Sequence, residues 1–134
     1  MVKVVLDTNI WISAIFFGGK LAHILNAWKE EKFTVVFSQD TFVEAENKLL
    51  FWGKKLDAEK EVAEYLLAIN KNAFFVYPQK HFTLSRDPKD NKLLDAACQA
   101  KAKYLVSGDR DLLVLEKIGK TKIIGPKVFL HMLL

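Results

Sequence analysis

Short runs of β-branched and aromatic residues alternate with longer segments of helical periodicity along the whole chain. The runs predict five strands, over residues 2–6, 33–37, 73–77, 103–107 and 122–124. The segments between them place apolar residues three and four positions apart, which predicts helices. These cover residues 8–17, 20–31, 39–52, a stretch from 57 onward, 89–101, 110–116 and a last helix from 126. The alternation predicts an α/β fold with a parallel sheet covered on both faces.

Glycine and proline mark the ends of several predicted helices. Gly18-Gly19 should stop the first helix, Gly53 should end the third, and Pro126 suits the first turn of the last. No linker, internal repeat or low-complexity tract interrupts the pattern. We therefore expect residues 1–134 to form a single domain.

Composition and cysteine content indicate whether the chain is globular, whether it enters a membrane and in which compartment it works. At 51% hydrophobic residues, the 134-residue chain can bury a full core. The longest apolar stretch, residues 10–17, is too short to span a bilayer, and Asp7 interrupts the N-terminal apolar run before it could act as a signal peptide. The single cysteine, Cys98, excludes an internal disulfide. These features predict a soluble, cytoplasmic protein with no membrane partner.

The net charge is modestly basic, with 20 Lys and Arg against 16 Asp and Glu and a formal charge of +4. Such an excess is compatible with a nucleic-acid partner and equally with a solvated, lysine-rich surface. The charge alone does not choose between them.

Acidic residues stand where several predicted strands end. Asp7 follows the first strand and Asp109 follows the fourth. Asp90 opens the helix before the fourth strand, and Glu44 lies near the start of the helix after the second. In an open parallel sheet all of these positions belong to the carboxyl edge, where ligands bind. Each Asp could also be a simple helix N-cap, and the pattern alone leaves this open.

A cluster of like charges repels itself and persists when a cation sits within it. Carboxylate oxygens without His or Cys favour Mg²⁺ or Mn²⁺. Such a cation takes phosphate oxygens as further ligands and lowers the pKa of an attacking water. The acids and the basic surface together suggest metal-assisted hydrolysis of a phosphodiester.

The second acid is ambiguous in the sequence. On a helical wheel, Phe42, Leu49 and Leu50 surround the direction of Glu46. Periodicity alone would therefore turn Glu46 toward the protein and Glu44 toward solvent. The first turn of a helix at a sheet edge need not follow that rule, so both glutamates stay open on pattern alone.

Three motifs, in this order, resemble the PIN-domain family. They are Asp7-Thr8-Asn9 after the first strand, residues 87–97 (DPKDNKLLDAA) and residues 107–112 (SGDRDL). Together with a glutamate in the helix after the second strand, they are similar to the branch assigned as toxins of prokaryotic toxin–antitoxin systems. The resemblance covers nearly the whole chain.

The resemblance implies a three-layer α/β/α fold with a five-stranded parallel sheet in the order 3-2-1-4-5. It also implies an Mg²⁺- or Mn²⁺-dependent endoribonuclease whose products carry 5′-phosphate and 3′-hydroxyl ends. The positions that match the family's catalytic and metal-binding acids are Asp7, Glu44, Asp90 and Asp109, which favours Glu44 over Glu46. The positions that match supporting polar residues are Asn9, Asp95, Ser107 and Asp111.

The same resemblance implies partners. RNA is the expected substrate, and from their positions we expect Lys54, Lys89 and Lys92 to steer its phosphates. A toxin would have an antitoxin protein as partner and would form a homodimer. Toxin-like members use their early helices for such contacts, so Trp11, Ile12, Ile15 and Phe16 are candidates for a partner surface as well as for the core.

Other α/β enzymes match less well. A haloacid-dehalogenase-like phosphatase needs a second Asp where this chain has Asn9. A response-regulator receiver needs a phosphorylatable Asp after the third strand, where Tyr77-Pro78 stands. A dinucleotide-binding domain needs a glycine-rich turn after the first strand, where this chain has Thr8-Asn9-Ile10. The alternative from a different class is a non-catalytic RNA- or partner-binding module on the same fold.

Overall fold

The protein folds around a twisted sheet, seen in a computed structural model that describes residues 1–133. The strands are β1 (Lys3–Leu6), β2 (Thr34–Ser38), β3 (Phe74–Val76), β4 (Tyr104–Val106), β5 (Lys117–Ile118) and β6 (Thr121–Ile124). The six strands lie in the order β3-β2-β1-β4-β6-β5. All neighbouring pairs are parallel except β5 and β6.

The predicted strand order is confirmed for the five strands foreseen in the sequence, and the edge of the sheet differs from the prediction. β5 adds a sixth, antiparallel strand, which pairs Ile118 with Thr121 across a two-residue turn. Gly119 stands at the first turn position with φ 55°, a conformation that short hairpin loops favour and glycine tolerates. A strand of two residues is too short to leave a periodic signal, which is why the all-parallel expectation is wrong here.

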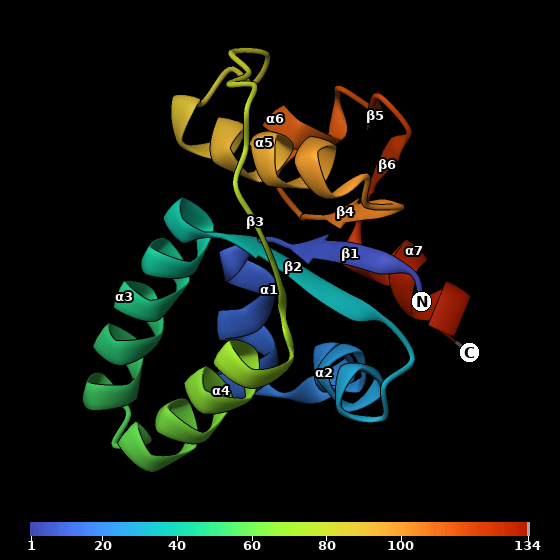
Figure 1. Cartoon of the computed structure of the whole chain (residues 1–134). Coiled ribbons are helices and arrows are strands. Elements are labelled where there is room, and N and C mark those ends of the chain that lie inside the picture. The colour runs from blue at the N-terminus through green and yellow to red at the C-terminus, as the bar shows by residue number, and fades with distance from the viewer. Residues whose placement is uncertain (134) are drawn as a thin grey trace.

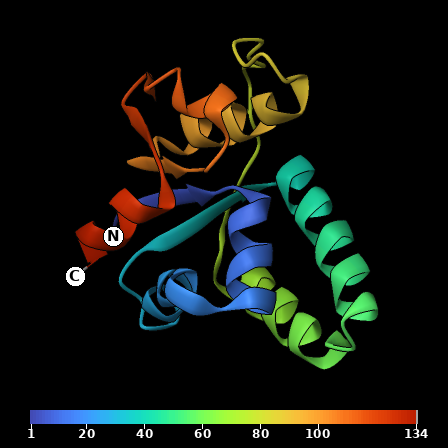
Figure 2. The same ribbon diagram turned by 180° about the vertical axis from the view of Figure 1, so that it is seen from behind.

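Helices cover both faces of the sheet. They are α1 (Thr8–Ile12), α2 (Ala22–Lys29), α3 (Gln39–Lys55), α4 (Glu59–Asn72), α5 (Asn91–Ala100), α6 (Arg110–Leu113) and α7 (Pro126–Leu133). Short helical turns are η1 (Ser13–Phe17), η2 (Gly19–Leu21) and η3 (Pro88–Asp90). Figure 1 shows α5 and α6 above the sheet and α1, α2, α4 and α7 below it, and Figure 2 shows the same layers from behind.

The alternation of side chains along each strand fills two separate cores. Val4, Val35 and Val106 face the layer of α1 and α2, where they pack with Trp11, among others. Val5, Leu105 and Ile123, among others, face α5 and pack against Leu93 and Leu94. Because both faces are buried, the strands are continuously apolar, as in other doubly covered parallel sheets. The three-layer α/β/α expectation is confirmed.

The first predicted helix is divided in two. α1 ends at Ile12 and continues as the π-helical turn η1 to Phe17, after which Gly18 turns the chain with φ 61°. Trp11 and Ile12 are buried in the core, so they do not form a partner surface, while Ile15 and Phe16 are half-buried.

Among residues 1–133, no single helix is long and apolar enough to cross a bilayer. The segments Thr8–Phe17 and Gly19–Lys29 reach that length and hydropathy only when taken together, as a pair bent by 109°.

Gly53 does not end its helix, contrary to the prediction, because α3 runs on to Lys55. The residue is buried where α4 crosses α3. A Cβ at this position would lie 2.7 Å from Val62 Cγ2, closer than side chains approach one another. The glycine therefore serves the close packing of two helices, and periodicity carries no signal for this.

Replacing Gly53 with alanine should destabilise the protein although alanine favours helices. We expect Gly53→Ala to lower the free energy of unfolding by about 1–3 kcal/mol, the usual effect of overpacking, measured by urea denaturation. The double variant Gly53→Ala/Val62→Ala, which removes the clash, should lose less than the sum of the two single variants. A Gly53→Ala protein more stable than wild type would show that helix propensity outweighs packing here.

Candidate active site

The register of the sheet brings Asp7 and Ser107 together at its carboxyl edge. Leu6 pairs with Val106, and Val106 with Ile124, so β1, β4 and β6 end level. The Asp7 N–H donates to the Val106 carbonyl at 3.0 Å. The Ser107 hydroxyl donates to Asp7 Oδ2 at 2.6 Å. Both side chains are buried, so this bond fixes the position of the Asp7 carboxylate.

Asp7 and Asp109 also cap helices. Asp7 is the N-cap of α1, and its Oδ1 accepts the Asn9 N–H at 3.3 Å. Asp109 is the N-cap of α6, and its Oδ1 accepts the Asp111 N–H at 2.8 Å. Ser107 Oγ in turn accepts the Asp109 N–H at 3.0 Å, so one hydroxyl joins the two acids. Asp7 and Asp109 are therefore helix N-caps, the role that the sequence left open beside a site. Capping engages only one oxygen of each carboxylate.

Asp90 reaches the same place from a different segment. It is the last residue of η3, directly before α5. Burial, a hydrogen bond shared with Asp109, and the negative charges of Asp109, Asp7 and Asp87 raise the pKa of Asp90 from its ordinary 3.8 to about 7. Within residues 1–133, Asp90 Oδ2 is buried and has no hydrogen-bond partner.

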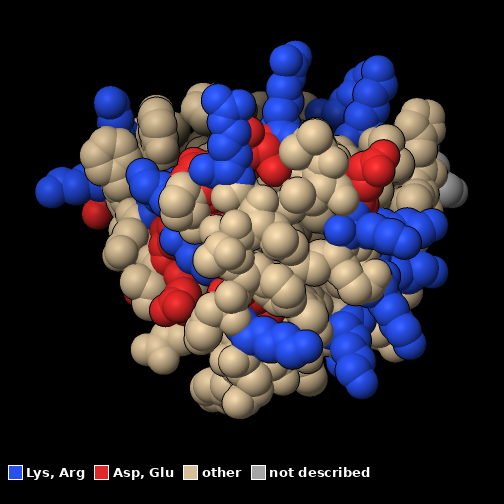
Figure 3. Space-filling view, turned by 90° about the horizontal axis from the view of Figure 1, so that it is seen from above, with Lys and Arg blue, Asp and Glu red and all other residues tan. Residues whose placement is uncertain are grey.

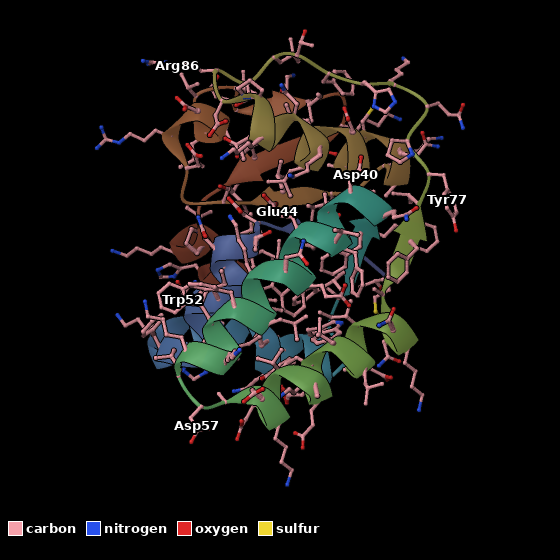
Figure 4. All side chains as sticks on the ribbon, turned by 90° about the vertical axis from the view of Figure 1, so that its left-hand side faces the viewer. Asp40, Glu44, Trp52, Asp57, Tyr77 and Arg86 are labelled. Carbon is pink, nitrogen blue, oxygen red and sulfur yellow. The ribbon has the colours of Figure 1, made fainter. Side chains whose placement is uncertain are left out.

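Glu44 completes the group from the second turn of α3. Its Oε2 accepts a hydrogen bond from the Thr8 hydroxyl at 3.2 Å, and its negative charge contributes to the raised pKa of Asp7. Figure 4 shows Glu44 at the end of α3 that faces the sheet and α5. Glu46, which the helical wheel placed toward the protein, is half-buried and makes no hydrogen bond or ion pair among the described residues. Sequence reasoning gave no role to Thr8, which positions Glu44.

We call the four acids Asp7, Glu44, Asp90 and Asp109 the carboxylate cluster. Burial, hydrogen bonds and ion pairs set the charge of each acid and keep the four together despite their mutual repulsion. Burial raises the pKa of Asp7, and the charges of Glu44 and Asp109 raise it further, while the bonds from Ser107 and Asn9 lower it. Lysines neutralise only Glu44, whose Oε1 lies 3.2 Å from Lys92 Nζ and 3.8 Å from Lys48 Nζ. In the described part of the chain, Asp7, Asp90 and Asp109 have no such ion pair.

The donor chemistry of the cluster fits a divalent cation. It offers only carboxylate oxygens, one of them buried without a partner, and these are the ligands that Mg²⁺ and Mn²⁺ prefer. As the side chains stand, no three acids, histidines or cysteines of residues 1–133 surround a common position for an ion.

The remaining predicted supporting residues divide into two groups. Asn9 and Asp111 donate their backbone N–H groups to the cluster, so they lie beside it. Asp95 is buried further along α5 and faces a loop, where it accepts the Phe82 N–H at 2.7 Å and lies 3.2 Å from His81 Nδ1. Asp95 thus anchors the loop before η3. Asn91, which the sequence did not single out, does the same by accepting the Ser85 N–H at 2.9 Å.

The three predicted phosphate-steering lysines lie at different distances from the cluster. Lys92 contacts Glu44, and the exposed Lys89 precedes Asp90. Lys54 lies in the last turn of α3, ten residues and about 15 Å along the helix from Glu44, so the structure does not bring it to the cluster. Figure 3 shows that acidic side chains on the face over α5 and its preceding loop lie between projecting Lys and Arg side chains.

Comparisons with known proteins identify the family of the chain. The family model of the PIN domain matches residues 3–111, which include the whole carboxylate cluster. The chain belongs to the PIN domain family. The uncharacterized protein MJ1680 of Methanocaldococcus jannaschii is 31% identical over 141 residues, covering 97% of this chain and 90% of that protein. The crystal structure of PAE2754 from Pyrobaculum aerophilum shares the fold, with a TM-score of 0.59 and 20% identity over 99% of this chain and 95% of that one.

Membership of the family has a coarse functional meaning. PIN domains are generally nucleases, which hydrolyse phosphodiester bonds and typically use divalent metals. The carboxylate cluster is the part of this PIN domain whose chemistry matches that activity.

The raised pKa of Asp90 predicts how stability depends on pH without metal. Between pH 3.8 and about 7 the folded protein keeps a proton on Asp90 that the unfolded chain loses. The unfolded state binds fewer protons in this window, so the free energy of unfolding should fall as the pH rises. Asp90→Asn, which stays neutral at every pH, should flatten this fall and raise the Tm by a few degrees above pH 7.

Thermal unfolding in EDTA from pH 4 to pH 8 would measure this difference. A wild-type Tm that falls no more steeply than that of Asp90→Asn would contradict the assigned environment of Asp90.

Proposed function

We propose that this PIN domain is a metal-dependent endoribonuclease whose reaction takes place at the carboxylate cluster. The observation that carries the proposal is the convergence of Asp7, Asp90 and Asp109 from three separate segments at one edge of the sheet, where the charge of Asp109 raises the pKa of both Asp7 and Asp90 and the charge of Asp7 raises that of Asp90. Glu44 joins them through Thr8. Folding alone does not favour such a concentration of charge, since it costs stability, and its occurrence in a nuclease family supports a catalytic use.

Asp7, Asp90 and Asp109 are the residues that would hold Mg²⁺ or Mn²⁺, with Glu44 at the border of that site. When bound, the cation supplies positive charge to phosphate oxygens and lowers the pKa of an attacking water. Ser107 keeps the Asp7 carboxylate in a fixed orientation through its 2.6 Å bond. The proton that Asp90 retains to near-neutral pH would leave as the site fills, because a carboxylate binds the cation in its charged form.

Glu44 is the candidate to orient the attacking water and to accept its proton. In the reaction, the water oxygen bonds to phosphorus, the bond from phosphorus to the 3′-oxygen breaks, and the leaving oxygen takes up a proton. This yields a 5′-phosphate and a 3′-hydroxyl. Lys92, 3.2 Å from Glu44, lies where it can neutralise a phosphate of the bound strand.

RNA as the substrate and a toxin role rest on the resemblance of the motifs at residues 87–97 and 107–112 to toxin-like PIN domains. As a toxin, the protein would act as a homodimer and be held inactive by an antitoxin. A small neighbouring gene that encodes a DNA-binding protein would support this role.

The Asp7→Asn variant separates catalysis from capping. Asparagine is as good an N-cap as aspartate, so α1 should stay intact, while the charge of the cluster is reduced. We expect cleavage of a single-stranded RNA with Mg²⁺ or Mn²⁺ to fall at least about 100-fold, the scale on which groups that act on transition-state charge contribute. The matched control is Glu46→Gln, a carboxylate-to-amide change on α3 outside the cluster, which should cleave like wild type.

EDTA should abolish cleavage by the wild-type protein. Equal cleavage by wild type and Asp7→Asn would refute the site. RNA binding without cleavage under any of these conditions would instead favour a non-catalytic RNA-binding module.

A further inference from the structure

Two exposed phenylalanines and a half-buried tryptophan form an aromatic group that includes the last turns of α3, which we call the aromatic platform (Phe17, Phe51 and Trp52). Phe51 is 60% exposed and Phe17 is 65% exposed. Trp52 lies between them, with its ring centre 5.7 Å from Phe51 and 6.4 Å from Phe17, both in edge-to-face contact. The contacts hold the rings in place, yet more than half of each phenylalanine stays accessible.

Lysines accompany the platform. Lys55 Nζ lies 5.8 Å from the Phe51 ring centre and 5.5 Å from that of Trp52, within the range of a cation–π contact. Lys48 lies between the platform and the cluster, where its Nζ is 3.8 Å from Glu44 Oε1. The chemistry of this surface is therefore aromatic and cationic together.

These residues share one face of α3. Glu44, Lys48, Phe51 and Lys55 follow at intervals of four, three and four residues, which places them on a single stripe of the helix. The stripe begins at the carboxylate cluster and reaches Phe51 about 10 Å further along the helix. Figure 4 shows Glu44 next to α5 and Trp52, the neighbour of Phe51 in the chain, farther along α3.

We propose that this stripe binds the single-stranded RNA substrate on one side of the cleaved bond, with a base stacked on the aromatic platform. The proposal rests on the proposed ribonuclease function. Proteins recognise single-stranded RNA by stacking unpaired bases on aromatic rings while cationic side chains follow the phosphates. Lys48 and Lys55 are placed to contact those phosphates before and beside the stacked base.

The alternative occupant of an exposed aromatic group is another protein, most simply a second copy of the chain. The position of Lys55 over both rings favours RNA. Lysine is depleted at protein interfaces, and burying an ammonium group in an apolar contact is costly. A polyanion needs no such burial, because it pairs with the lysine directly.

Tryptophan fluorescence provides a direct test of stacking. Trp11 and Trp28 are buried, so Trp52 is the tryptophan that a bound base can reach. The Asp7→Asn protein in EDTA, which should not cleave, would be titrated with a single-stranded oligouridylate. We expect quenching of Trp52 by the oligouridylate, and little quenching by an abasic ribose-phosphate chain of the same length.

Phe51→Leu removes the ring but keeps an apolar side chain of similar reach. In the same background, we expect it to weaken oligouridylate binding about tenfold by fluorescence anisotropy, in line with the loss of one stacking contact. The control is Leu67→Ala, which shortens a side chain 70% exposed on α4 and should leave the affinity unchanged.

Sedimentation of the wild-type protein and Phe51→Leu tests whether a second copy of the chain, and not RNA, covers the aromatic platform. If Phe51→Leu dissociates a dimer while its affinity for the oligouridylate stays at the wild-type value, the platform is an interface between copies and the proposal is overturned. Unchanged affinity with unchanged assembly overturns it as well. If Asp7→Asn lacks cleavage but Phe51→Leu binds and cleaves normally, the proposed ribonuclease function is supported and only the proposed role of the aromatic platform is refuted.

Discussion

The hydrogen bond from Ser107 to Asp7 ties the ends of the two central strands, and the rest of the site depends on it. It forms because β1 and β4 are parallel and end level, so residues 100 positions apart in sequence meet at one edge. The same hydroxyl receives the Asp109 N–H, which places the second acid. Asp90 and Glu44 then approach from helices that begin at this edge. The sheet register thus determines where four negative charges gather.

Four acids at one site lower the stability of the fold when no cation is bound. The structure shows how each acid limits this repulsion. Glu44 is neutralised by Lys48 and Lys92, whereas Asp90 retains a proton to near-neutral pH. The protein tolerates the remaining repulsion because helix caps and buried hydrogen bonds fix Asp7 and Asp109. Lys48 also stands at the start of the stripe toward Phe51, so the same helix that carries an acid of the cluster could carry the substrate away from it.

The sequence was sufficient for the order of the five main strands and for the placement of Asp7, Asp90 and Asp109, because strand ends and helix starts can be read from local patterns. It was insufficient where tertiary contacts decide. Glu44 escaped the helical-wheel rule because the first turns of α3 face the sheet edge and Thr8. Gly53 resembles a helix terminator, but its partner Val62 lies in the next helix. Asp95 belongs to a motif next to the site, yet faces the loop at His81 and Phe82.

The central claim is that the carboxylate cluster binds a divalent cation, and calorimetric titration with Mn²⁺ in buffers of different ionisation enthalpy tests it most directly. Because the pKa of Asp90 is about 7, binding at pH 6 should release close to one proton, and the measured heat should vary with the buffer. The Asp90→Asn protein should bind more weakly and release fewer protons. Mn²⁺ binding that is unchanged in Asp90→Asn and Asp7→Asn, or no binding by the wild-type protein, would contradict the account.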